Sequence, residues 1–177
     1  MSDMEILSEL ISESARVPHE NEHGKPVIKL QEDEYVSLIR NIPSDAMVIK
    51  ADKFPAPQSF FKGNQGECKR ADFIIISEEK KVILYIELKD GSSENSYIIK
   101  QLKGSFCVIS YCKAIGRHFW KKKTFLEDYQ HRYIGMVKLG LNKKPFFHKL
   151  STLHDSPENF LKISSPQYLQ FNQLAAL

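Results

Sequence analysis

The sequence predicts a single domain of the α/β class, in which strands form a sheet and helices pack on it. The chain has 177 residues, of which 42% are hydrophobic and 27% are charged, and this size and composition are typical of one folded core. Residues 71–88 contain two neighbouring apolar runs rich in β-branched side chains, which is typical of paired strands. Residues 97–113 then carry apolar side chains at the spacing of a helix.

The segment before residue 51 predicts two helices and a strand. Apolar residues recur at helical spacing over residues 3–15, which predicts a short amphipathic helix. A second apolar stripe predicts a helix from about Gln31 to Asn41, and it consists of positions 35, 38, 39 and 42. Met47–Lys50 is predicted as a strand. A Pro-rich stretch over residues 54–67 is expected to be a long surface loop.

Two apolar runs, residues 71–76 and 81–88, predict a β-hairpin, because only four polar residues separate them. Their nearly continuous apolar character indicates central strands covered on both faces. Residues 97–113 predict a long helix after this hairpin, and residues 132–139 predict a further strand. The remaining C-terminal segment mixes short apolar runs with prolines and predicts no clear element.

The hairpin is expected to bring three charged side chains together at one end. A turn centred on residues 79–80 places Asp72 directly opposite Glu87 on the neighbouring strand. Side chains alternate along a strand, so Lys89 lies on the same face as Glu87, while the intervening Leu88 points to the other face. Two acids and an amine therefore converge where an apolar sheet ends.

This arrangement is costly without a counter-charge, because opposed carboxylates repel and partly buried charges lose hydration. A divalent cation would offset that cost. The carboxylates of Asp72 and Glu87 and the backbone carbonyl of Leu88 offer the oxygen ligands that Mg²⁺ or Mn²⁺ prefers. The alternative interpretation is a structural ion pair of Lys89 with Glu87 or Asp72.

Charge is unevenly distributed along the chain, whose formal net charge is +3. Residues 1–34 carry a net charge of −6, whereas residues 97–150 carry +10. Such a basic segment predicts a polyanion-binding surface, most often for nucleic acid, or a solvated face that keeps the protein soluble. The candidate phosphate-binding residues are Lys100, Lys103, Lys113, Arg117, Lys121, Lys122 and Lys123. Phe119 and Trp120 lie within this segment as candidates for base stacking or for packing.

The residues Arg70-Ala71-Asp72 at a strand start, followed by a turn and the sequence Ile-Glu-Leu-Lys-Asp at 86–90, resemble the PD-(D/E)XK nuclease superfamily. Ala71 replaces the proline that names the motif. The resemblance covers about residues 27–139, and residues 32–105 are most similar to restriction-endonuclease-like and Holliday-junction-resolvase-like domains. It implies a restriction-endonuclease-like core, in which helices flank a mixed central sheet in the order αβββαβ, and Mg²⁺-dependent cleavage of nucleic acid. Residues 140–177 are predicted to extend the same domain.

The superfamily resemblance also implies roles for individual residues. Asp72 and Glu87 match its metal ligands, and Lys89 matches its catalytic lysine. Members of the superfamily often carry a further acid on the first core helix, where Glu32 fits best and Glu34 is the second choice. Gln101 on the following helix resembles a glutamine that some subfamilies place near the lysine, and an ordinary exposed helix residue is the alternative.

Cysteine usage and hydropathy bear on the compartment. The chain has three cysteines, an odd number, which argues against a disulfide framework and favours a reducing, cytoplasmic environment. Cys107 and Cys112 fall in the helical pattern and are expected in the core. No apolar run is long enough for a membrane span, so no membrane partner is expected.

We therefore predict a metal-dependent nuclease that hydrolyses phosphodiester bonds, with DNA as the expected substrate and Mg²⁺ or Mn²⁺ as the cofactor. The alternatives are a catalytically silent nucleic-acid-binding or assembly subunit with the same fold, and an unrelated interaction module with a structural ion pair. The expected partners besides nucleic acid are a second copy of the chain or another protein, because small nucleases of this type commonly use a second subunit to cut both strands.

Overall fold

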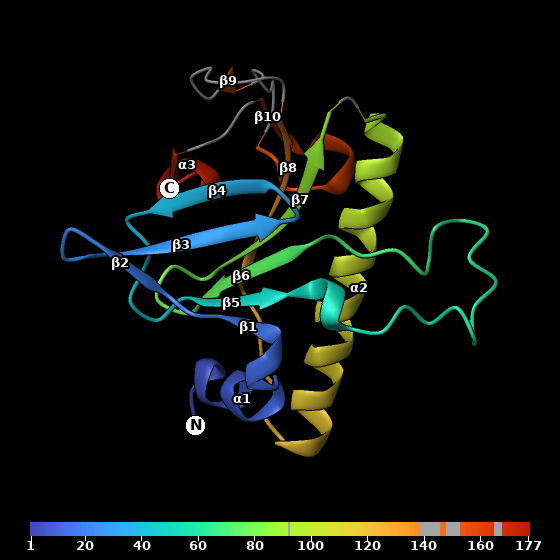
Figure 1. Cartoon of the computed structure of the whole chain (residues 1–177). Coiled ribbons are helices and arrows are strands. Elements are labelled where there is room, and N and C mark those ends of the chain that lie inside the picture. The colour runs from blue at the N-terminus through green and yellow to red at the C-terminus, as the bar shows by residue number, and fades with distance from the viewer. Residues whose placement is uncertain (92, 139–145, 148–152, 165–167) are drawn as a thin grey trace.

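A computed structural model of the chain describes residues 1–91, 93–138, 146–147, 153–164 and 168–177. These residues form a mixed α/β structure with two mixed sheets and three α-helices (Figure 1). The helices are α1 (Asp3–Leu10), α2 (Asn95–Phe119) and α3 (Phe171–Ala175). Short 3₁₀ turns cover Glu13–Ala15, Ala51–Lys53 and Pro157–Asn159.

The first sheet contains seven strands in the order β1-β5-β6-β7-β8-β10-β9. Their bounds are Arg16–Val17 (β1), Met47–Lys50 (β5), Phe73–Ser77 (β6), Val82–Asp90 (β7), Gln130–Lys138 (β8), Leu161–Ser164 (β10) and Phe146–Phe147 (β9). Strands β5, β6 and β7 run antiparallel, and β8 runs parallel to β7. Helix α2 lies in the crossover that a parallel pair requires.

The second sheet contains four strands in the order β11-β4-β3-β2. Their bounds are Tyr168–Gln170 (β11), Tyr35–Arg40 (β4), Lys25–Glu32 (β3) and Glu20–Glu22 (β2). Strands β3 and β4 form an antiparallel hairpin, and β11 joins β4 in parallel. The C-terminal segment therefore contributes strands to both sheets.

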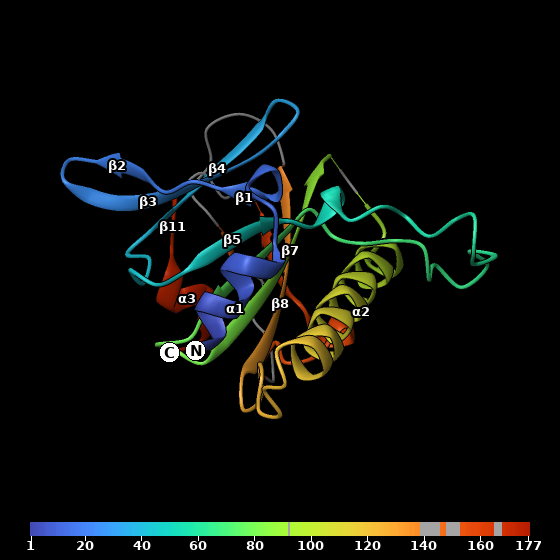
Figure 2. The ribbon, with the colours of Figure 1, turned by 90° about the horizontal axis from the view of Figure 1, so that it is seen from below.

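The first sheet lies between two layers (Figures 1 and 2). Helices α1 and α2 pack on one of its faces, where Ile74 and Tyr85 join the side chains of Ile6 and Leu102 in one apolar cluster. The second sheet and α3 pack on the opposite face. Strands β6 and β7 are buried on both sides as a result, which confirms the prediction of central, fully covered strands.

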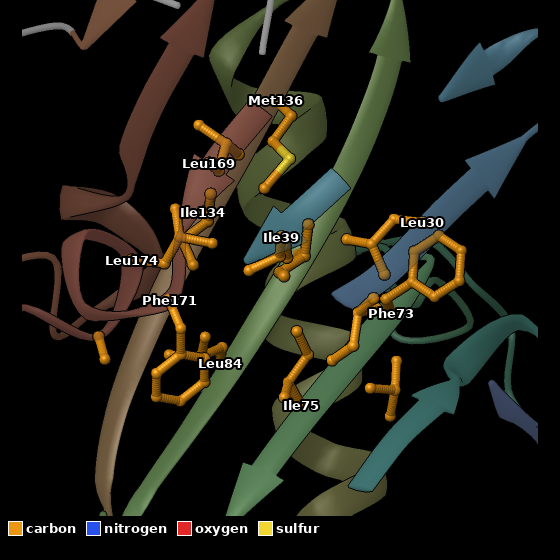
Figure 3. Close-up of a cluster of buried hydrophobic side chains, with 14 of the residues drawn as sticks. Leu30, Ile39, Phe73, Ile75, Leu84, Ile134, Met136, Leu169, Phe171 and Leu174 are labelled. Carbon is orange, nitrogen blue, oxygen red and sulfur yellow. The ribbon is translucent and has the colours of Figure 1, made fainter. Parts of the chain in front are cut away.

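A second apolar cluster fills the space between the two sheets (Figure 3). Leu30 and Ile39 of the second sheet meet Phe73 and Leu84 of the first, and Phe171 of α3 closes the cluster. All of these side chains are fully or almost fully buried. The two sheets thus share one core.

Replacing Phe171 with Ala is expected to lower the free energy of unfolding by about 3–5 kcal/mol, because a fully buried aromatic ring leaves a cavity that neighbours fill only in part. Urea unfolding followed by circular dichroism measures the change. Phe119→Ala is the control, since that ring is 78% exposed and its removal should change stability by less than about 0.5 kcal/mol. Equal losses for both variants would contradict this assignment of the core.

The predicted helix from Gln31 to Asn41 is wrong, because these residues form the end of β3, a tight turn and β4. Asp33 takes a left-handed φ of 49° in the turn, a conformation that Asp tolerates. Burial along β4 then alternates, so that Tyr35, Ser37 and Ile39 face the core. Apolar spacing alone fitted a helix, but pairing with β3 and β11 determines the structure.

Other elements agree with the sequence more closely. The strand at Met47–Lys50, the hairpin and the long helix are confirmed, although α2 extends to Phe119. The N-terminal helix ends at Leu10 rather than residue 15, and a 3₁₀ turn follows it. The expected burial of Cys112 is confirmed, but that of Cys107 is wrong, because Cys107 lies on the exposed side of α2.

Part of the prediction for the C-terminal region lies outside the described residues. The strand expected at 132–139 is confirmed as β8 up to Lys138, whereas residue 139 is not described. The basic residues Lys143, Lys144 and Lys149 also lie outside the described part of the chain. Among the described helices, none has the length and apolar character needed to cross a membrane.

Candidate active site

The candidate site lies where β7 ends and α2 begins. The register between β6 and β7 pairs Phe73 with Ile86, so Asp72 and Glu87 occupy the next opposed positions, as the sequence predicts. The Asp72 carboxylate accepts a hydrogen bond from the backbone N–H of Leu88, with 2.7 Å between nitrogen and oxygen. This bond holds the start of β6 against the end of β7.

Alternation along the strands determines which face carries the charged groups. Ile74 and Tyr85 point to the α2 side of the sheet, so Asp72, Glu87 and Lys89 also face α2. Leu88 points to the other side, into the core between the sheets. The structure therefore confirms the predicted convergence of two acids and an amine.

Helix α2 adds the fourth group to this cluster. The side-chain amide of Gln101 donates a hydrogen bond of 3.2 Å to Oε1 of Glu87. The ammonium Nζ of Lys89 lies 2.5 Å from the same oxygen. Gln101 is therefore not an ordinary solvent-facing residue, but helps to orient the buried carboxylate.

Burial and proximity change the protonation of the two acids. Burial and the neighbouring Glu87 raise the pKa of Asp72 to about 8. Burial also raises the pKa of Glu87, although its bonds to Lys89 and Gln101 oppose the shift. The Glu87 carboxylate disfavours ionisation of Asp72, because two negative charges in this site repel each other.

Lys89 remains charged beside this pair. Burial disfavours the ammonium, but the Glu87 carboxylate outweighs burial and raises the pKa of Lys89. Its side chain is 24% exposed, whereas that of Glu87 is fully buried. The ammonium can therefore contact Glu87 and an incoming anion at the same time.

A divalent cation fits this donor set. When Glu87 is ionised, its oxygen Oε2 is buried and has no hydrogen-bond donor among the described residues. Asp72 and Glu87 offer two negative charges against the single positive charge of Lys89, and burial raises the pKa of both acids. A cation bound between them would contact the unpaired oxygen of Glu87 and relieve the repulsion between the two carboxylates.

The backbone carbonyl of Leu88 is the candidate for a third oxygen ligand. In an antiparallel ladder one residue turns both its N–H and its carbonyl toward the same neighbouring strand. Because the N–H of Leu88 bonds Asp72, its carbonyl is expected on the Asp72 side as well. Within the described parts of the chain, no group of three or more His, Cys, Asp or Glu side chains is placed to hold a metal ion. A cation would thus need this carbonyl, water and substrate.

Glu32 lies near the site, although not on the helix that was expected. It is the last residue of β3, and its charge contributes to the raised pKa of Asp72. It has no hydrogen bond or ion pair with Asp72, Glu87 or Lys89 among the described residues. Glu34, the second choice, is exposed in the turn after β3. Glu32 therefore lies outside the cluster of Asp72, Glu87 and Lys89, and its carboxylate adds to the negative charge around Asp72.

The predicted phosphate-binding residues separate into two groups along α2. Lys100 and Lys103 flank Gln101, and Lys103 pairs with Glu158 at 2.6 Å. The other group lies around the far end of α2, and Arg117 is roughly 24 Å from Gln101 at 1.5 Å per helical residue. It consists of Lys113, Arg117, Lys121, Lys122 and Lys123. Of the two groups, the first lies on the part of α2 that carries Gln101.

The far group is also partly neutralised. Lys122 pairs with the buried carboxylate of Asp3 at 2.7 Å, and Arg117 pairs with Glu127. Trp120 donates a hydrogen bond to Glu9 and packs half-buried near α1, which favours packing over base stacking. The contacts of Lys122 with Asp3 and of Trp120 with Glu9 attach helix α1 to the segment at the end of α2.

Sequence reasoning missed two residues beside the site. Tyr97 lies on the first turn of α2, and its ring lies 5.0 Å from Nζ of Lys89 and 3.5 Å from Nζ of Lys69. These cation–π contacts place a second ammonium, that of Lys69, against the same ring that Lys89 contacts. The available signal was the four-residue spacing of Tyr97 and Gln101, which puts them on one helix face.

Comparison of the chain with models of known protein families, with curated proteins and with solved structures gave no match. The geometry of the site therefore carries the functional argument.

Proposed function

We propose that this protein is a metal-dependent nuclease that hydrolyses phosphodiester bonds in DNA, with Mg²⁺ or Mn²⁺ as its cofactor. The observation that carries the proposal is the convergence of the half-buried Asp72 with the fully buried Glu87 and with Lys89, which leaves Oε2 of Glu87 without a hydrogen-bond partner among the described residues. The restriction-endonuclease-like resemblance agrees with the order of β5, β6, β7, α2 and β8, in which Lys89 follows the second acid. The hairpin of β3 and β4 stands where the resemblance places the first core helix, at about residues 31–41.

Each residue of the site would have a separate role in this reaction. A cation held by Asp72, Glu87 and the Leu88 carbonyl would supply an activated water and neutralise charge on the phosphate. Lys89, already protonated and partly exposed, would orient the attacking water or stabilise charge that develops on the phosphate. Gln101 would keep Glu87 in place, and Lys100 would contact the backbone of the nucleic acid.

A catalytically silent subunit that binds nucleic acid is the second candidate. It is favoured by the absence, within the described residues, of three acidic or metal-ligating side chains grouped around a metal position. Such a subunit would bind DNA in a salt-sensitive manner, would not need a cation and would keep its function when Glu87 is changed.

The decisive experiment incubates the protein with plasmid, linear and branched DNA, and with RNA, in Mg²⁺, Mn²⁺ or chelator. We expect cleavage of DNA only with the cations, and loss of cleavage in Glu87→Gln. Glu79→Gln is the matched control, because Glu79 lies exposed in the turn of the same hairpin. Calorimetry should register uptake of the cation by the wild type but not by Glu87→Gln. Cleavage that persists in Glu87→Gln would rule out this mechanism, and binding without cleavage or cation uptake would support the silent subunit.

A further inference from the structure

A cavity lined by aromatic side chains lies between the loop after β5 and helix α2. Its volume is about 660 Å³, within the usual range of ligand pockets. Phe54 and Phe61 of the loop and Tyr111 of α2 line it, and the rings of Phe54 and Tyr111 meet edge to face at 6.3 Å. Phe60 also lines the cavity and is 84% exposed. The ring of Phe60 packs edge to face on that of Phe61 at 4.9 Å, and contiguous exposed apolar patches of this kind mark binding sites.

The wall of this cavity is fixed to α2 at two points. Gly104 allows the backbone carbonyl of Lys69 to lie against the helix, because a Cβ at this position would be only 1.6 Å from that oxygen. Two residues after Lys69, the backbone N–H of Ala71 donates a buried hydrogen bond of 2.7 Å to the hydroxyl of Ser105 on α2. The cavity is therefore held in a constant position relative to Asp72, which follows Ala71 directly.

The cavity and the candidate active site lie along one side of α2. Gln101 contacts Glu87, while Gly104 and Tyr111, three and ten residues further on, line the cavity. At 1.5 Å per helical residue, these positions are roughly 5 and 15 Å from Gln101. A stacked nucleic acid strand advances about 3.4 Å per nucleotide, so the cavity lies roughly one to four nucleotides from a phosphate at the acid pair.

The charge around the cavity favours an anionic ligand. Lys69 and Arg70 line it, and Nε of Arg70 is buried with no hydrogen-bond partner among the described residues. Glu67 is the acidic lining residue, but its carboxylate accepts hydrogen bonds from the loop N–H groups of Gly63 and Gln65. Lys69 also shares the ring of Tyr97 with Lys89, so cationic groups continue from the cavity to the acids.

We propose that this cavity stacks an unpaired base of the nucleic acid whose phosphate lies at the acid pair, so that the substrate is single-stranded or carries an unpaired segment. The assignment of the phosphate rests on the proposed nuclease function. Exposed aromatic rings stack on any base, and neighbouring cations bind the phosphates on either side. A paired duplex would not offer a free base face to the rings of Phe60 and Tyr111.

The test measures binding in chelator, where no cleavage occurs. A short single-stranded DNA carrying 2-aminopurine, a base whose fluorescence falls on stacking, is titrated with wild type, Tyr111→Ala and Phe60→Ala. We expect quenching by the wild type and roughly 5- to 100-fold weaker binding by each variant. Tyr168→Ala is the matched control, because Tyr168 is 51% exposed, close to the 57% of Tyr111, and lies on the second sheet. The fully paired duplex should bind more weakly and quench less.

Each outcome separates this inference from the nuclease proposal. If DNA is cleaved through Glu87 but Tyr111→Ala and Phe60→Ala bind like the wild type, the nuclease stands and the base site is wrong. If quenching depends on both rings but no cation supports cleavage, the base site stands and the nuclease is wrong. Equal weakening by Tyr168→Ala, or equal binding of duplex and single strand, overturns the base site.

Discussion

Asp72→Asn is expected to abolish the proposed cation-dependent cleavage of DNA, with a loss of at least about 10³-fold, because the change removes one of the two carboxylates that the described residues bring together as proposed metal ligands. The fold should survive. The amide oxygen of Asn can still accept the hydrogen bond from the Leu88 N–H, and the side chain keeps its shape. Single-turnover cleavage measures the first effect, and circular dichroism with urea unfolding measures the second.

The same variant should also change how stability depends on pH in chelator. Because the pKa of Asp72 rises from 3.8 to about 8 on folding, the native protein binds more protons than the unfolded chain between these values. Wild-type stability should therefore fall as pH rises from about 5 to about 8, by at most about 1.4 kcal/mol per pH unit.

Asp72→Asn should flatten this dependence, and saturating Mg²⁺ should flatten it in the wild type, because a bound cation replaces the proton. Asp128→Asn is the control, since Asp128 is exposed beyond the far end of α2 and should leave the slope unchanged. A slope that is the same in all three proteins would show that the acid pair does not hold a proton in solution.

Gly104→Ala is expected to destabilise the protein by about 1–3 kcal/mol and to reduce both cleavage and binding of unpaired bases. The added methyl carbon would lie 1.6 Å from the carbonyl oxygen of Lys69, far inside contact distance, so the backbone before Asp72 must move away from α2. Urea unfolding, cleavage and 2-aminopurine binding measure the three effects.

Helix propensity alone predicts the opposite sign, because Ala is favoured over Gly by about 1 kcal/mol within a helix. Ala114→Gly supplies the comparison, since Ala114 is exposed on the same helix and this change should lower stability by about that amount without affecting cleavage. If Gly104→Ala were stabilising, the close approach of the loop to α2 would be wrong.

The parts of the fold that depend on local sequence could be predicted. The turn between β6 and β7 fixes the pairing of its strands, and the regular apolar spacing of α2 fixes its buried face. The prediction for residues 31–41 failed because their apolar spacing fits a helix, whereas β4 pairs with the neighbouring β3 and with β11, which lies far away in sequence. Ser37 lies outside the apolar stripe of the expected helix. It is fully buried because side chains alternate in β4, which turns Ser37 toward the core with Tyr35 and Ile39.

The candidate site also contains a part that the sequence predicts and a part that it does not. The register of one hairpin predicts that Asp72, Glu87 and Lys89 converge, and the structure has them on one face. Glu32 was expected from a helix that does not exist, and it comes near Asp72 only because β3 ends there. The aromatic cavity was not predicted, because loop conformation depends on the close contact at Gly104 rather than on a periodic pattern.

Strand β11 has a consequence for how the chain reaches its native state. Leu169 pairs with Ile39, 130 residues earlier, so the second sheet is completed by a contact of very long sequence separation. Loop-closure entropy makes such contacts late and slow to form. Until they form, β4 presents an unpaired edge beside apolar side chains that are buried in the native protein. Partly folded chains should therefore associate through this edge, and dilute refolding should favour the monomeric route.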